Sequence, residues 1–350
     1  MATITPYATG ASIKDMVNEA LINAIRDGRA AIEWKDVIKA KQLKDLGPPE
    51  DVEYIERERH AVAIHEACHA VAAYKARRHL TIDIATIEKG GTYLGLVASI
   101  PPEDQFTQWR SEYESDIVVS LASLAGERMF FEGDSSSGVS GDLESATQIA
   151  TMMEGYWGMG STVASHGVTH EVGIGGGGKP GEGKKEDLLK SSLGYRIEAK
   201  LADLLKRTND LLAENRASIL AVAHALERNK TVTGEDIQAI IEGRDGPLID
   251  GRPYLRPDFL EMAETYHDKV VAAHKGHSKV EASLPALPLL ADVQVGGDGS
   301  MPAQEGFGNG EADAARRSDE SDLAADGDGS AERSRGTSDA DPEPEPTPEA

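Results

Sequence analysis

The sequence predicts a mostly α-helical protein with one small β-hairpin and a long acidic tail. Apolar residues recur at helical spacing over most of the first 284 residues. Only residues 80–100 combine Ile- and Thr-rich runs with a central Gly-Gly turn, the pattern of two adjacent strands. Residues 285–350 hold 16 acidic and 4 basic residues and few large apolar ones. We therefore expect this tail to be disordered and to lie outside the core.

Residues 1–50 are expected to form a small unit of two helices. Ser12 is a candidate N-cap, and apolar residues follow it at amphipathic spacing: Ile13, Met16, Val17, Ala20, Leu21 and Ala24. A basic turn comes next, and a second helix is expected from about residue 33 to residue 46. Gly47 and the two prolines after it end that helix.

A third helix is predicted over residues 51–78. Its first part is charged, whereas its second part, residues 60–74, is nearly apolar apart from histidines and one glutamate. Such a helix is expected to be buried on most sides. Because an unpartnered polar group is costly to bury, the polar side chains within it require a specific role.

The remaining elements follow from periodicity and turn signals. The hairpin is expected to pair residues 80–87 with residues 92–100 through the turn at Gly90 and Gly91. Further helices are predicted over residues 109–131, 142–157, 188–228 and 253–275, with one short helix capped by Thr233. A Ser/Gly-rich loop precedes Asp142, and residues 161–184 are rich in glycine.

Charge and cysteine content exclude several classes of protein. The chain has 36 basic and 60 acidic residues and a formal net charge of −24, which argues against a nucleic-acid partner. The single cysteine, Cys68, excludes an intramolecular disulfide framework and fits a reducing, cytoplasmic compartment. The N-terminus lacks the pattern of a secretory signal. No apolar run is long enough to span a membrane directly.

The chemistry is indicated by His65-Glu66-Ala67-Cys68-His69, an H-E-x-x-H segment on the predicted buried helix. Residues four apart lie on one helix face, so both imidazoles can reach one metal ion. Glu66 projects from the flank of that face, where it can touch a metal-bound water without ligating the metal. A catalytic zinc ion takes three protein ligands and keeps one position open for water.

A third ligand must come from outside this helix. Asp142 is the best candidate because it follows the Ser/Gly loop and opens a predicted helix. An ordinary N-cap is the alternative role for an aspartate in that place. Glu132, Asp134 and Glu144 are the runners-up.

These segments together resemble the peptidase domain of the FtsH family of AAA proteases. That family carries an H-E-A-G-H helix and a distant aspartate in a G-x-x-x-D-[LI]-x-x-A-T context, which here corresponds to residues 65–69 and residues 138–147. Asp142 follows His69 by 73 residues, a separation that suits the family. Other segments resemble the family in the same order: residues 89–95, 157–159, 212–216 and 233–237.

The resemblance implies a helical, zincin-type peptidase domain over residues 51–243. It implies one zinc ion per chain, held by His65, His69 and Asp142, with Glu66 as the catalytic base. The family's edge strand corresponds to the segment that would bind an extended, unfolded polypeptide substrate: Thr92, Tyr93, Leu94, Gly95 and Leu96. Residues 1–50 resemble the helical lid of an AAA module, residues 244–284 form a helical extension, and residues 285–350 are the acidic tail.

The sequence also departs from the family pattern. Cys68 stands where the family usually has glycine, and we interpret it as a small apolar residue or, alternatively, as an oxidation-sensitive group. The 350 residues contain no counterpart of the remaining ATPase module or of the family's membrane helices. Residues 173–180 approach a phosphate-binding loop, but Pro180 replaces the hydroxyl residue that such a loop requires, so we interpret them as a surface loop.

Two functions therefore compete. The first is a zinc endopeptidase that acts without ATP or with an AAA ATPase partner in trans, with a homohexamer as the assembly that the family resemblance implies. The second is a non-catalytic module that keeps the fold and assembles with an AAA protease. The intact Glu66 favours the enzyme, whereas the lid-like segment without an ATPase favours the module.

Overall fold

The computed structural model describes residues 8–289 except 49, 51, 92, 104, 164 and 166–182. Thr92 of the predicted substrate segment, the loop at residues 173–180 and nearly all of the predicted acidic tail lie outside these residues. In the described part of the chain, no helix combines the length and apolar character needed to cross a bilayer.

The first two helices form a hairpin with its own small core. Helix α1 spans Gly10–Arg26 and helix α2 spans Trp34–Leu46. Their contact is made by buried side chains spaced along one face of each helix: Met16, Ala20, Val37 and Ala40. The cap of α1 is Thr9 rather than Ser12, because the Thr9 side chain accepts a hydrogen bond from the Ser12 amide and the helix begins two residues before Ser12.

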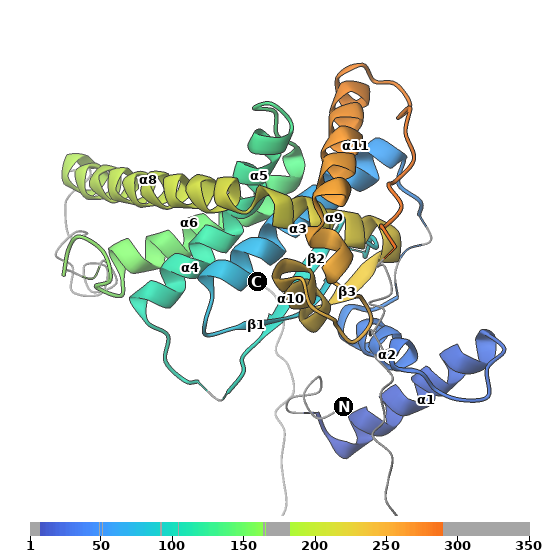
Figure 1. Cartoon of the computed structure of the whole chain (residues 1–350). Helices are drawn as coiled ribbons and strands as arrows, with labels where there is room; N and C mark the ends of the chain where they lie inside the picture. Colours follow the sequence, from blue (N-terminus) through green and yellow to red (C-terminus); the bar gives the residue numbers. More distant parts are fainter. Residues whose placement is uncertain are drawn as a thin grey trace, which may run out of the picture. The chain divides into compact units, whose positions relative to one another are not determined.

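Helix α3, Glu56–Ala76, is the central helix of the main core. Its side chains from Val62 to Ala73 are buried almost without interruption, as expected for a helix that lacks a polar face. It contacts α4, α5, α9 and α11 (Figure 1). Small residues such as Ala63, Ala67 and Ala70 allow these neighbours to approach closely.

A three-stranded antiparallel sheet lies against this helix. Strand β1, Thr81–Thr86, pairs with β2, Leu96–Ile100, and with β3, Thr231–Thr233, in the order β2-β1-β3. The predicted hairpin is therefore present, with β2 as an edge strand that begins at Leu96 rather than at residue 92. The sequence does not predict β3, because three residues between two helices are too short for a period-two pattern to be recognised.

Two predicted long helices are each divided in the structure. The helix predicted over 109–131 consists of α4, Arg110–Ser120, and α5, Ala122–Phe130. The helix predicted over 188–228 consists of α8, Gly183–Glu214, and α9, Arg216–Asn229. At the second break the Asn215 side chain donates to the Leu211 carbonyl, which gives the backbone an alternative to helical bonding.

The remaining elements complete the core. The Ser/Gly loop contains a 3-10 turn, η2, at Ser137–Val139 and leads into α6, Ser140–Gly155. Beyond β3, the chain forms α10 at Gly234–Glu242, a 3-10 turn, η3, at Arg252–Leu255, and α11 at Pro257–Lys275. Tyr254 and Phe259 from this last part are fully buried in the same core as α3 and α9.

Gly126 on α5 explains how the core accommodates Cys68. A Cβ atom at Gly126 would lie 2.2 Å from Cys68 Sγ, so α3 and α5 can approach this closely only because position 126 is glycine.

We expect Gly126→Ala to lower the free energy of unfolding by about 1–3 kcal/mol through overpacking. In a Cys68→Gly background the same change should be neutral or stabilising. Urea denaturation of the single and double variants measures this coupling.

Gly194→Ala provides the matched control. Gly194 also lies within a helix, but no atom lies within 4 Å of its Cβ position. The added methyl group should therefore stabilise the helix by about 0.5–1 kcal/mol. If Gly126→Ala destabilised the unmodified chain and the Cys68→Gly variant equally, the thiol would not be the steric partner.

Candidate metal centre

Helix α3 brings His65 and His69 to one face. Their ring centroids lie 5.0 Å apart and the ring planes meet at 70°. Both residues come from the part of α3 that is packed into the core, so their side chains have little freedom to move. This fixed separation is the first requirement for two ligands of one ion.

Asp142 completes the cluster from the first turn of α6. Its Oδ2 atom lies 3.3 Å from His65 Nε2 and 3.2 Å from His69 Nε2. The ligand atoms of all three residues lie within 4.8 Å of one another, and no other such group of His, Cys, Asp or Glu occurs among the residues described. The structure thus brings together the three residues expected to bind metal.

The alternative third ligands lie elsewhere. Glu132 forms an ion pair with Lys275, and the carboxylate of Asp134 lies 3.5 Å from His274 Nε2. Glu144 accepts a hydrogen bond from a glutamine on its own helix. None of these carboxylates belongs to the cluster formed with His65 and His69.

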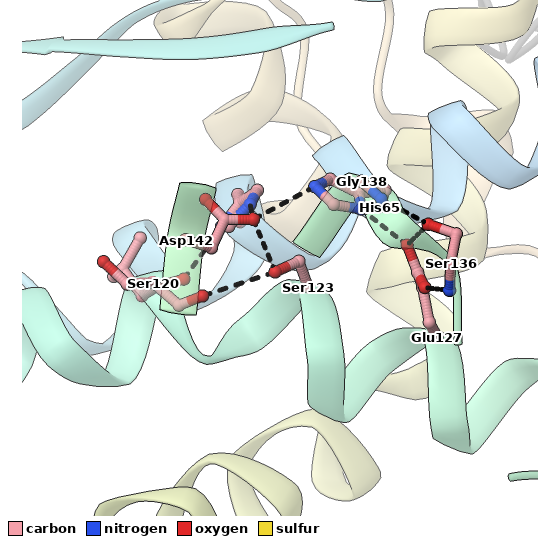
Figure 2. A network of polar contacts seen from close by, with 9 residues as sticks. His65, Ser120, Ser123, Glu127, Ser136, Gly138 and Asp142 are labelled. Atoms are coloured by element: carbon pink, nitrogen blue, oxygen red, sulfur yellow. Dashed lines mark hydrogen bonds and ion pairs between the residues drawn. The ribbon is translucent and has the colours of Figure 1, made fainter. Parts of the chain in front are cut away.

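Each histidine is oriented from behind by a hydrogen bond at Nδ1. His65 Nδ1 lies 2.8 Å from Glu127 Oε1 on α5 (Figure 2), and His69 Nδ1 lies 2.8 Å from the Val119 carbonyl on α4. A carbonyl only accepts, so His69 Nδ1 carries a proton. The Nε2 atom of His69 faces Asp142, where its lone pair would be available to a metal ion. A histidine ligand held in this way is pre-organised for a metal ion.

The two carboxylates are themselves held by serines. Ser123 Oγ donates to Asp142 Oδ2 at 2.7 Å, and Ser136 donates to Glu127 through both its amide and its hydroxyl (Figure 2). Sequence reasoning missed Glu127, Ser123 and Ser136. The one available signal was Glu127 itself, a charged residue next to Arg128 in a mostly apolar stretch, and periodicity alone does not assign it to this site.

The electrostatics of the cluster favour an anionic Asp142 beside a cationic His65. Burial alone would lower the pKa of His65, but hydrogen bonds to Asp142 and Glu127 outweigh it and raise that pKa to about 10. Burial would raise the pKa of Asp142, but hydrogen bonds from His65 and His69 outweigh it and lower that pKa. Two imidazole nitrogens and one ionised carboxylate are a donor set that fits zinc with a position left for water.

Glu66 lies next to this cluster and is 5% exposed. Burial raises the pKa of its carboxyl group, while the neighbouring His69 and His65 act in the opposite direction. A carboxylate with a raised pKa accepts protons more readily than an exposed one. This is the property expected of a general base.

The predicted substrate segment is adjacent to Glu66. A Cβ atom at Gly95 would lie 2.6 Å from Glu66 Oε1, so the backbone there approaches the carboxylate directly. The Leu94 carbonyl accepts a hydrogen bond from the Tyr54 hydroxyl at 2.8 Å, and Leu96 begins β2. The ring of Tyr93 lies over Gly90, where it would clash with a side chain.

Cys68 faces away from the cluster into the core. Its side chain is fully buried, and burial strongly raises the pKa of its thiol. A buried thiol of this kind is poorly reactive. The structure therefore favours the interpretation of Cys68 as a small apolar residue over that of an oxidation sensor.

Two histidines of an H-E-x-x-H helix beside a carboxylate are an arrangement typical of metallopeptidases. Comparison with known families is more specific, because the model of peptidase family M41 matches residues 53–240. The chain belongs to this family.

Its relatives include proteins described as ATP-dependent zinc metalloprotease FtsH. The one from Pelobacter propionicus is 32% identical over 244 residues, which cover 68% of this chain and 38% of the relative. The one from Acidimicrobium ferrooxidans is 29% identical over 282 residues, with 75% and 41% covered. The one from Acidothermus cellulolyticus is 29% identical over 299 residues, with 83% and 43% covered. The chain spans about two fifths of the length of these relatives.

Replacement of Asp142 tests the metal site. Asp142→Ala removes the only anionic member of the cluster, so zinc affinity should fall by at least about tenfold. Competition with a chromogenic chelator measures this affinity. Glu144→Ala, on the same helix but outside the cluster, is the control and should bind zinc as the unmodified chain does. Equal zinc affinity in the Asp142 variant would place the third ligand elsewhere.

Proposed function

We propose that this chain is a zinc metalloendopeptidase that hydrolyses peptide bonds of unfolded polypeptides. The observation that carries the proposal is the convergence of His65, His69 and Asp142 beside the buried Glu66. Membership of peptidase family M41 supports the same chemistry. His65, His69 and Asp142 would hold the ion, and Glu66 would serve as the base.

Glu66 and the groups that hold the two histidines would have different roles in hydrolysis. Zinc, when bound, lowers the pKa of a coordinated water and polarises the substrate carbonyl. Glu66 accepts the proton of the attacking water and later transfers it to the leaving amine. The raised pKa of Glu66 suits both transfers, because the group must take up a proton and release it within one cycle. Glu127 and the Val119 carbonyl keep both imidazole rings in place throughout.

An extended substrate would bind along the outer edge of β2. Among the described strands β2 has β1 as its only neighbour, so its other edge is available for backbone pairing. The proposed substrate segment, Thr92 to Leu96, precedes and begins this strand, and Gly95 approaches Glu66. Backbone pairing depends little on the side chains of the substrate, so it suits unfolded polypeptides and gives modest sequence selectivity.

Partner, assembly and location belong to this proposal as well. The chain would act without ATP or with an AAA ATPase supplied in trans, in the cytoplasm, and as a hexamer if it assembles as the family resemblance implies. A stimulation of cleavage by ATP that requires an added ATPase would support the partner-dependent form. ATP-stimulated cleavage by the purified chain alone would contradict both forms.

A non-catalytic assembly module is the second candidate. It is favoured by an exposed apolar face on α1, where Val17, Leu21 and Ile25 follow one another at intervals of four residues and are 39%, 42% and 62% exposed. Such a face is typical of a surface that binds another helix or domain. A module of this kind would bind a partner without digesting unfolded protein.

The Glu66→Gln variant separates base catalysis from metal binding. We expect it to retain zinc and to lose cleavage of an unfolded protein by about 100-fold or more, because the amide cannot take up the proton. Digestion of casein, with a chelator control, measures cleavage, and metal analysis measures zinc. Full digestion by the variant would refute the role of Glu66. A zinc-loaded, unmodified chain that digests nothing would favour the assembly module.

Gly95→Ala tests the close approach to Glu66. The added methyl group would displace the carboxylate, so kcat should fall by about tenfold or more while zinc is retained. Gly91→Ala is the matched control, because no atom lies within 4 Å of its Cβ position. Equal kcat values for the two variants would contradict the role of this contact.

A further inference from the structure

Helix α11 lies beyond the segment matched by the family model, yet it contacts an element of the metal centre. His267 on α11 is 2% exposed, and its Nε2 atom lies 3.0 Å from the carbonyl of Phe130, the last residue of α5. The same imidazole contacts the Phe130 ring edge-on at 5.2 Å between centroids. The end of α5 is therefore held by a side chain from α11.

The Phe130 carbonyl only accepts, so His267 donates to it from Nε2. Burial lowers the pKa of His267 to about 4, so in the neutral ring Nδ1 accepts from His60 Nε2 on α3, at 3.0 Å. His60 Nδ1 in turn lies 2.6 Å from Glu227 Oε1 on α9. A continuous buried chain of hydrogen bonds thus connects α5, α11, α3 and α9.

The end of α11 contacts the connection between α5 and η2 a second time. The ring of His274 lies 5.6 Å from that of Phe131, and its Nε2 atom lies 3.5 Å from Asp134 Oδ2. Lys275 forms an ion pair with Glu132. Glu132 has a φ of 55°, in the left-handed region that a residue with a side chain rarely adopts. This turn therefore depends on contacts from outside for its conformation.

Residues 131–136, which α11 contacts in this way, help to orient the proposed zinc ligand His65. It joins Glu127 on α5 to Ser136, and both amide and hydroxyl of Ser136 donate to Glu127. Glu127 in turn holds the His65 ring at Nδ1. A shift of residues 130–136 would loosen Glu127 and with it the orientation of His65.

We propose that α11, through His267, is a positioning element of the metal centre, so that the part of the chain beyond the M41 match is required to orient His65. The expected effect on zinc binding rests on the proposed function, whereas the expected effect on hydrogen exchange of residues 131–139 does not. His267 touches neither metal nor substrate, and it acts through the end of α5.

The test compares His267→Leu with His267→Gln in the full chain. Leucine loses both hydrogen bonds, whereas the glutamine amide can donate to the Phe130 carbonyl and accept from His60. We expect His267→Leu to weaken zinc binding by about threefold to tenfold and His267→Gln to restore most of it. Hydrogen exchange of residues 131–139 should become about tenfold faster in the leucine variant, with α10 unchanged.

Tyr266→Phe is the matched control. Its hydroxyl donates to Glu227 Oε2 at 3.2 Å, so the variant removes one hydrogen bond from the same buried group of side chains without touching α5. Zinc affinity and exchange of residues 131–139 should stay within about twofold of the unmodified chain. A structural role for the whole buried network would instead change both variants alike.

A second variant keeps the test decisive if His267→Leu does not fold. The double variant His274→Ala/Lys275→Ala removes the contacts of these two exposed side chains with Phe131, Glu132 and Asp134. It should speed hydrogen exchange of residues 131–136 alone. Unchanged exchange and zinc affinity in the folded variants would overturn the proposal. Faster exchange in a chain whose unmodified form binds no zinc would retain the positioning role and refute the proposed function instead.

Discussion

The structure depends on the burial of one helix that carries polar side chains. Helix α3 is surrounded by other elements from His60 to Ala73, and His65, Glu66 and His69 also lie within this stretch. Burying such groups without partners costs several kcal/mol each. Their neighbours must therefore supply hydrogen bonds with good geometry, and this requirement determines where α4, α5, α6, α9 and α11 can place their own polar groups.

The candidate metal centre is supported by two layers of hydrogen bonds. The two histidines direct Nε2 toward Asp142 because their Nδ1 atoms are occupied by Glu127 and the Val119 carbonyl. The carboxylates of Asp142 and Glu127 are in turn held by Ser123 and Ser136 (Figure 2). Side chains held by these hydrogen bonds would lose little conformational entropy if an ion bound.

Small residues allow the same helix to serve both the core and the site. Gly126 permits α5 to lie against Cys68, and Gly95 permits the chain before β2 to lie against Glu66. The first approach brings Glu127, one residue further along α5, within reach of His65. The second brings a strand edge beside the carboxylate proposed as the base. The family usually has glycine at the position of Cys68. In this chain the close contact between α3 and α5 is kept because Gly126, opposite Cys68, has no side chain.

The sequence by itself determined the helical class, the hairpin with its edge strand, and the three residues that converge as a candidate metal site. The helices and the hairpin follow from local periodicity, and the two histidines follow from the spacing of the H-E-x-x-H segment. Asp142 was the best of several candidates by its place after the Ser/Gly loop, and the resemblance to the FtsH family singled it out. The predicted domain bounds and the roles of the site residues stay predictions. Only the tertiary structure decided the breaks at Leu121 and Asn215, the short strand β3, the position of Glu127 behind His65, and the contact of His267 with the end of α5. The physical reason is that each of these depends on residues distant in sequence, whose mutual placement no local pattern records.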